Sequence, residues 1–142
     1  MRLTSRLSAT LAPRTVVRAH CDVPCGIYDP AGAQLAARTV ARMVELIGQM
    51  DMSDNSVANR NKFVRCITVK EQHAELVKRE VQVIWSDYFK PEHLAKVPDL
   101  HDQVWKLLKL ASKNKQNVDA AAAAELVAAT EAFAKAFAAS KA

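Results

Sequence analysis

Two cysteines and a histidine lie close together near the start of the chain. His20 directly precedes Cys21, and three residues separate Cys21 from Cys25. Thiolate and imidazole groups are soft to borderline ligands, which suit zinc, copper or nickel better than magnesium or calcium. A structural zinc site normally needs a second pair of ligands, and the third cysteine, Cys66, stands alone in a helical pattern. The spacing by itself therefore leaves a metal site, a disulfide and two unreactive thiols as alternatives.

Residues 1–19, which precede these side chains, have the composition of a removable leader. They contain four arginines and no acidic residue, and Ser, Thr, Ala and Leu make up much of the rest. Arg6, Pro13 and Arg14 interrupt the apolar positions, so the segment is a poor export signal and no membrane span. Its composition is similar to that of an organelle transit peptide, and the alternative interpretation is a disordered tail of the kind common at chain ends. We expect a cleavable leader at 1–19 and a mature domain at 20–142.

Cleavage after Ala19 would change the chemistry available at His20. It would free an α-amine, whose ordinary pKa of about 7.7–8.0 lets a metal displace its proton near neutral pH. The donors would then be the amine and imidazole of His20, the amide nitrogen and sulfur of Cys21, and the sulfur of Cys25. A square-planar set of nitrogen and sulfur donors favours Ni(II) or Cu(II) over zinc. Before cleavage the amine is a peptide nitrogen, so the leader would prevent the site from assembling.

The stretch from His20 to Pro30 resembles the nickel hook of the nickel superoxide dismutases. That family has the pattern His-Cys-Asp-x-Pro-Cys-Gly-x-Tyr-Asp-Pro at a processed N-terminus, and every fixed position is matched here. Residues 85–93 (WSDYFKPEH) are similar to a second block of the family, and residues 70–72 and 98–101 follow in the family's order. The resemblance runs from about His20 to the C-terminus and puts the nickel hook at 20–28.

The resemblance implies an enzyme that disproportionates superoxide to O2 and H2O2 by cycling nickel between Ni(II) and Ni(III). It implies His20, Cys21 and Cys25 as the ligands of a nickel ion. It also implies a maturation protease that removes the leader, and a homohexamer in which neighbouring bundles shield the hooks.

Further roles follow from the resemblance for residues around the ligands. Tyr28 is expected over the open face of the metal, where it orders water and restricts access to a small anion, with Tyr88 beside it. Pro24 is expected to follow a cis peptide bond that closes the hook, and Asp22 to be held through its backbone. Lys90 is expected to support the hook or to attract anions. The alternatives are an ordinary tyrosine at a helix start for Tyr28, a core residue for Tyr88 and a solvated lysine for Lys90.

Two positions depart from the family pattern. Family members orient the axial imidazole with a Glu early in the first helix and an Arg midway along the second. Ala36 and His73 occupy those positions here. Ala36 cannot form the hydrogen bond, whereas His73 can donate or accept one. The hydrogen bonds that orient the metal's ligands are therefore expected to differ from those of other family members.

The composition excludes several classes of protein. A chain of 142 residues fits one domain with a single core. The leader's four arginines account for most of the net charge of +5, and no basic stripe with interleaved aromatic residues indicates nucleic-acid binding. Three cysteines, an odd number, argue against a disulfide scaffold. We expect no nucleic-acid or membrane partner and a cytoplasmic location, with an organelle as the alternative.

The rest of the chain has the periodicity of helices. Asp29 followed by Pro30 is typical of a helix start, and Pro91 should end the second helix. The predicted helices span residues 30–51, 55–89, 98–113 and 118–140, with a short turn at 91–96. Four amphipathic helices with short connections predict an all-α, antiparallel up-and-down four-helix bundle.

Four residues outside the hook carry specific expectations. Lys70 falls on the polar face of the second helix, and Cys66 is expected to be a small buried hydrophobe. His93 and His101 are expected at the surface or in a connector, with no role as metal ligands.

Two other functions compete with the enzyme. A helical bundle of this kind could store or deliver nickel or copper without turnover, in which case Tyr28 would not be needed. Alternatively, the bundle is purely structural and its cysteines are incidental.

Overall fold

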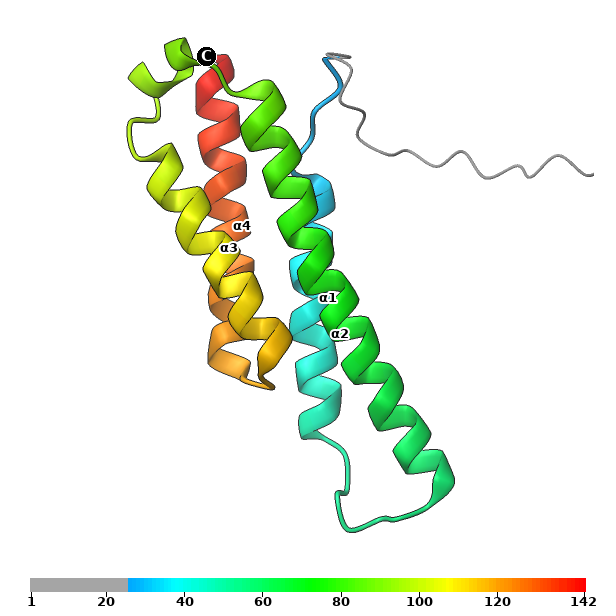
Figure 1. Cartoon of the computed structure of the whole chain (residues 1–142). Coiled ribbons are helices and arrows are strands. Elements are labelled where there is room, and N and C mark those ends of the chain that lie inside the picture. The colour runs from blue at the N-terminus through cyan, green and yellow to red at the C-terminus, as the bar shows by residue number, and fades with distance from the viewer. Residues whose placement is uncertain (1–25) are drawn as a thin grey trace, which may run out of the picture.

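The computed structural model describes residues 26–142 (Figure 1). The leader and the predicted ligands His20, Cys21 and Cys25 lie outside the described residues, as do Asp22 and Pro24. The described part of the chain forms α1 (Ala31–Gly48), α2 (Val57–Val83), α3 (Leu100–Gln116) and α4 (Ala120–Lys141). A π-helical turn, η1 (Ile84–Tyr88), continues α2, and a 3-10 turn, η2 (Pro91–Ala95), lies in the connector to α3.

The helices form the predicted antiparallel up-and-down bundle. Helix α1 packs against α2 and α4, and α3 packs against the same two helices. Figure 1 shows that α1 and α2 extend as a hairpin beyond the ends of α3 and α4. At the opposite end of the bundle, the C-terminal turn of α4 lies beside the connector that holds η2.

Side-chain caps explain where two of the helices begin. The hydroxyl of Ser56 accepts a hydrogen bond from the Asn59 amide at 3.2 Å, and the Asp119 carboxylate accepts one from the Ala122 amide at 3.1 Å. These bonds satisfy amides that have no partner within their helix. At the start of α1, Asp29 accepts from the Ala31 amide at 2.8 Å. The predicted signal at Asp29 is thus confirmed to within one residue.

Alanines and β-branched residues fill the bundle's interior. Small side chains let the helices approach closely, and larger ones from each helix occupy the space between them. Fully buried members include Ala33, Ala37, Val40, Ala74, Val77, Val81, Ile84, Leu100, Leu126 and Phe133. Cys66 is 8% exposed, which confirms the prediction that it is buried.

Three predicted helix ends were wrong by three residues or more. The first helix ends at Gly48 rather than at residue 51. The second helix does not continue as one α-helix to residue 89, because η1 follows Val83 and is closed by a bond from the Phe89 amide to the Ile84 carbonyl at 3.3 Å. The third helix ends at Gln116 rather than 113. Side chains satisfy its last carbonyls, including that of Lys113, which accepts from the Asn117 side-chain amide at 3.0 Å.

The expectation that Lys70 lies on a polar face was also wrong. Lys70 is 1% exposed, and its ammonium donates hydrogen bonds to the backbone carbonyls of Asn114 and Lys115. A lysine at this position can cap the C-terminal turn of α3, where carbonyls lack partners and carry partial negative charge. Burial lowers the pKa of the Lys70 ammonium. The side chain therefore ties α2 to the turn between α3 and α4.

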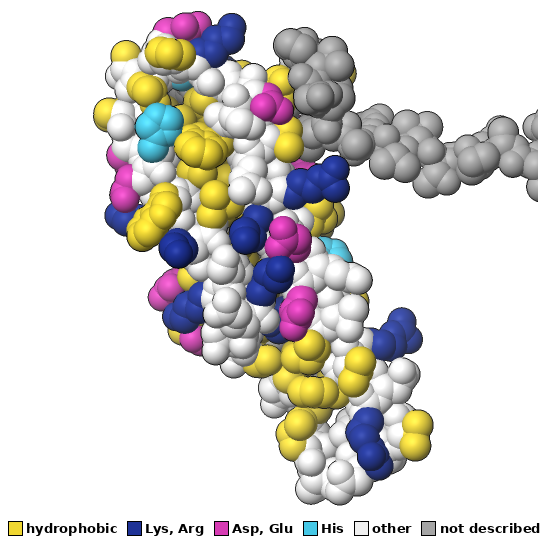
Figure 2. Space-filling model, viewed as in Figure 1, with side chains coloured by type: hydrophobic (Ala, Val, Ile, Leu, Met, Phe, Trp, Pro, Cys, Tyr) yellow, Lys and Arg dark blue, Asp and Glu magenta, His cyan; other side chains and the backbone are white. Residues whose placement is uncertain are grey.

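Charged and apolar side chains are distributed unevenly over the surface of the described residues. Across residues 26–142, no helix is long and apolar enough to cross a bilayer. Figure 2 shows Lys and Arg side chains interspersed with Asp and Glu on the visible face. Hydrophobic side chains gather where α1 and α2 extend beyond the other helices. Exposed apolar residues at this end include Met52, Val57 and Val64.

Candidate metal centre

The residues that directly follow the predicted ligands are part of the bundle from Tyr28 onward. Gly26 comes directly after Cys25 and has a φ of +71°, a backbone conformation that favours glycine. Two residues later, Tyr28 is 9% exposed and belongs to the bundle's core. Asp29 then begins α1 through its bond to the Ala31 amide. The last part of the predicted hook is thus fixed to the first turn of α1.

Tyr28 and Tyr88 lie together, as the resemblance implies. Their ring centroids are 5.7 Å apart and the rings are inclined by 56°. Tyr88 comes from the π-helical turn η1, a kind of turn that is frequent at functional sites. The structure therefore brings together residues that are 60 positions apart in the sequence.

An aromatic cluster surrounds Tyr88. Its ring centroid is 5.1 Å from that of Phe89, 5.1 Å from that of His93 and 4.6 Å from that of Phe137. His93 is stacked on Tyr88 with an interplanar angle of 10°, and its Nδ1 accepts a hydrogen bond from the Lys90 amide at 3.0 Å. Residues from η1, η2 and α4 thus support one tyrosine.

Two residues that support Tyr88 were not predicted from the sequence. His93 does lie in the connector, as expected, but it is half-buried against Tyr88 rather than an unengaged surface residue. Ser140 lies 2.9 Å from the Tyr88 hydroxyl, and nothing in the sequence indicates this contact. The residues in the stretch from Tyr88 to His93 could have suggested stacking, whereas a serine in the last turn of a helix gives no such signal.

The residues that depart from the family pattern lie elsewhere in the bundle. Ala36 is 1% exposed and packs within the core. His73 is half-buried, and its Nδ1 lies 2.8 Å from the Val69 carbonyl, so this nitrogen donates the bond. Because His73 precedes Tyr88 by 15 residues, the two are separated by about 22 Å along the helix axis. The structure does not bring His73 to the tyrosine pair within this chain.

Lys90 is exposed beside a small surface pocket. The pocket has a volume of about 150 Å³ and also involves Trp85, Phe89, Pro91, Leu94 and His101. His101 is exposed, and its Nδ1 accepts a hydrogen bond from the Trp85 indole at 2.9 Å. Among the described residues, neither this pocket nor His101 is part of a group that could hold a metal ion.

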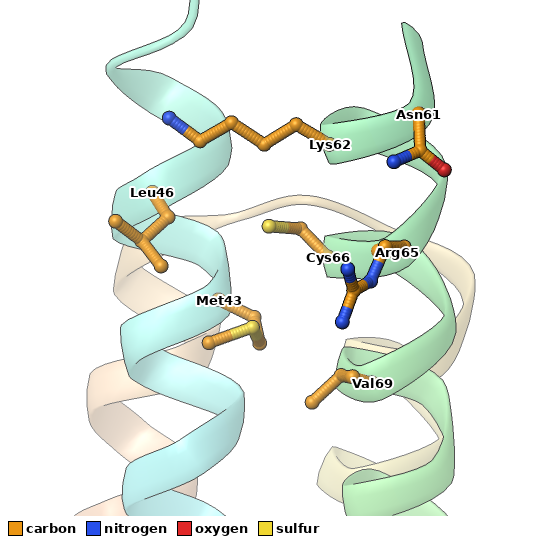
Figure 3. A pocket seen from close by; sticks show the side chains of 7 residues that line it. All are labelled: Met43, Leu46, Asn61, Lys62, Arg65, Cys66 and Val69. Atoms are coloured by element: carbon orange, nitrogen blue, oxygen red, sulfur yellow. The ribbon is translucent and has the colours of Figure 1, made fainter. Parts of the chain in front are cut away.

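The described part of the bundle offers no metal site of its own. Among the described residues, no three His, Cys, Asp or Glu side chains gather closely enough to hold a metal ion. Cys66 lines a cavity of about 290 Å³ between α1 and α2, with its sulfur directed toward Met43 and Leu46 (Figure 3). The nickel site at the thiols of Cys21 and Cys25 and the nitrogens of His20 stays a prediction from the sequence, with donors of a kind that suits nickel.

A family model described as nickel-containing superoxide dismutase matches residues 15–141. This chain belongs to that family. The chain is similar to the protein named superoxide dismutase [Ni] of Streptomyces coelicolor, with 44% identity over 115 residues that cover 81% of this chain and 82% of that protein. The protein of the same name from Streptomyces seoulensis is 41% identical over the same shares of the two chains.

Solved nickel superoxide dismutases also have this fold. The native structure superposes with a TM-score of 0.75 and 37% identity, covering 87% of this chain and all of that one. The apo structure superposes with a TM-score of 0.70 and 37% identity, covering 79% of this chain and 95% of that one. The helical bundle expected from the sequence is therefore the fold of the family.

Proposed function

We propose that this chain, once residues 1–19 are removed, is a nickel-dependent superoxide dismutase that converts superoxide to O2 and H2O2. The family match, which includes the entire hook sequence, carries this proposal. His20, Cys21 and Cys25 would hold the nickel through the α-amine, the imidazole, the Cys21 amide nitrogen and the two thiolates. Bound nickel would supply one-electron chemistry by alternating between Ni(II) and Ni(III).

The described residues would control access to that centre. Tyr28 is buried against Tyr88 only three residues after Cys25, so the two rings can form a wall next to the hook. A wall of packed rings would exclude large molecules, while phenol hydroxyls can bind water or a small anion. The tyrosines would therefore restrict the site to small species such as superoxide.

Lysines around the aromatic cluster would favour an anionic substrate. The ammonium of Lys96 donates to the Ser140 carbonyl at 3.4 Å, and that of Lys141 lies 4.2 Å from the centre of the Phe137 ring. Lys90 adds an exposed positive charge directly before η2. Clustered positive charge raises the local concentration of a small anion.

Assembly, maturation and location complete the proposal. We propose a homohexamer, because Ile27 leaves 77% of its surface exposed right beside the hook and a neighbouring subunit could cover it. A maturation protease would cut after Ala19, since only a free amine at His20 provides the full donor set. We propose a cytoplasmic location, with an organelle as the alternative if the leader acts as a transit peptide.

The decisive experiment compares superoxide consumption by protein that begins at His20 with consumption by the untrimmed chain, each with and without nickel. We expect activity only in the trimmed, nickel-loaded sample. If that sample binds nickel but consumes no superoxide, the enzyme proposal is wrong and a nickel or copper carrier becomes the better interpretation. If the trimmed protein binds no nickel, the hook assignment is wrong as well.

A further inference from the structure

The hydroxyl of Tyr88 has a defined partner in α4. Its oxygen lies 2.9 Å from Oγ of Ser140, a residue that is 3% exposed in the last turn of that helix. The same Oγ lies 2.7 Å from the backbone carbonyl oxygen of Phe137. The three oxygens therefore form a short chain from the tyrosine to the backbone of α4.

The direction of the hydrogen bonds in this chain is fixed. A carbonyl oxygen can only accept, and a serine hydroxyl has one proton to donate. Ser140 therefore donates to the Phe137 carbonyl, and Tyr88 must donate to Ser140. Because a phenol also carries a single proton, the Tyr88 oxygen can then only accept a hydrogen bond from any other group.

The turn that carries Ser140 is itself held in place. Its carbonyl accepts from the Lys96 ammonium at 3.4 Å, which satisfies one of the free carbonyls at this helix end. The Phe137 ring packs against Tyr88, and the Lys141 ammonium covers that ring. Ser140 therefore has a supported position from which to orient the tyrosine.

We propose that Ser140 is a positioning residue that accepts the hydrogen bond of the Tyr88 hydroxyl and so leaves the Tyr88 oxygen able only to accept hydrogen bonds from other groups. Tyr88 would then orient a water molecule by accepting one of its protons, and it would not donate to superoxide. The catalytic meaning of this arrangement rests on the proposed function, whereas the orientation of the hydroxyl does not.

The orientation can be tested in the metal-free, full-length chain by NMR. The chain has two tyrosines, so labelling with 13C at tyrosine Cζ gives two resonances, and Tyr28→Phe assigns them. We expect Ser140→Ala to shift the Tyr88 resonance by more than its line width, because Cζ senses the bonding of its hydroxyl. Ser140→Thr, which keeps a hydroxyl, should return the resonance toward its wild-type position.

Ser112→Ala is the matched control. Ser112 is half-buried and donates to the Leu108 carbonyl at 3.1 Å, so the variant loses a similar bond that does not involve a tyrosine. Both resonances should keep their wild-type positions. An unchanged Tyr88 resonance in Ser140→Ala, with a wild-type circular dichroism spectrum, would overturn the proposal.

A second measurement tests the role in the nickel-loaded, trimmed protein. Ser140→Ala should reduce superoxide turnover roughly two- to tenfold, the usual effect of one lost hydrogen bond, with unchanged nickel content. In a Tyr88→Phe background the same change should cause no further loss, because Ser140 acts through that hydroxyl. Independent losses that multiply would overturn the positioning role. If the wild type itself were inactive, the proposed function would fail, and the NMR comparison would still decide whether Ser140 orients Tyr88.

Discussion

At the scale of single residues, the candidate centre draws on two parts of the chain. The predicted ligands precede Gly26, whereas Tyr28 and everything that supports Tyr88 belong to the bundle. From the sequence alone Tyr28 could equally be a tyrosine at an ordinary helix start. Its burial fits either interpretation, whereas its contact with Tyr88 is the one that the resemblance implies.

The ligand assignment predicts different effects for the cysteines. Cys25→Ala should weaken nickel binding by at least about tenfold, since even the loss of a group behind a ligand has an effect of that size. Metal content after dialysis against nickel buffers measures this in protein that begins at His20.

Cys66→Ala is the control for the loss of a thiol. Cys66 is buried between α1 and α2. The variant should bind as much nickel as the wild type, while its free energy of unfolding should be lower by roughly 1 kcal/mol. Equal nickel loss in the two variants would contradict the assignment of Cys25.

At the scale of elements, the bundle depends on contacts between helix ends as well as on its core. Lys70 of α2 caps the end of α3, and Asp119 caps the start of α4 directly after the turn. Asn114 of α3 also donates to the Ala122 carbonyl at 2.9 Å, which joins the same two helices. The α3–α4 turn is therefore fixed from both sides.

Lys70→Met should lower the free energy of unfolding by roughly 1–3 kcal/mol, because two carbonyls at the end of α3 lose a charged donor. Urea denaturation measures the change. Lys106→Met removes an exposed lysine whose partner is Asp102 in the same helix, and a much smaller effect is expected. Equal effects of the two substitutions would show that the buried cap contributes nothing specific.

Asp119→Ala should lower the melting temperature by an amount that depends on pH. The hydrogen bond from the Ala122 amide, helped by Lys113, lowers the pKa of the Asp119 carboxyl. A lowered folded-state pKa contributes stability above the unfolded-state pKa of about 3.9, and this stability is lost as the pH falls through the folded-state value. The difference between wild type and variant should therefore shrink below about pH 4.

Ser56→Ala serves as the control in thermal melts at each pH. It removes the cap of α2 without removing an ionisable group, so its effect should vary less with pH. A constant effect of Asp119→Ala across the acidic range would contradict the role of its charge.

At the scale of the whole molecule, the sequence predicted the bundle because helical periodicity is a local property. Val40, Val44 and Ile47 recur at helical spacing and are buried in α1. Lys70 and Ser140 could not be predicted in the same way, because their partners lie 44 and 52 residues away. The turn η1 was missed because residues 84–88 continue the apolar pattern of α2 while the backbone hydrogen bonding changes.

If positive charge on the protein attracts superoxide, the rate of superoxide consumption should depend on salt concentration. Superoxide consumption by the trimmed, nickel-loaded protein should fall as ionic strength rises, because the Debye length shrinks to about 8 Å at physiological salt. Lys90→Gln should lower the rate at low salt and make its dependence on salt shallower.

Lys109→Gln provides the comparison for that measurement. Lys109 is an exposed lysine of α3 whose ammonium lies 5.8 Å from the centre of the Trp105 ring. Its removal changes the net charge equally but should leave the salt dependence near that of the wild type. Identical slopes for the two variants would exclude a local role for Lys90.

The turn η1 determines how a change in the length of this segment would act. Each residue of an α-helix turns the chain by about 100°, and a π-helical turn holds one residue more than the α-helical turn it replaces. Deleting Ser86, which is exposed, would remove the extra residue and let the segment continue as regular α-helix, with the residues after it near their present orientation. A one-residue deletion at this position should therefore be tolerated, whereas the same deletion in a regular α-helix would turn every following residue by about 100°.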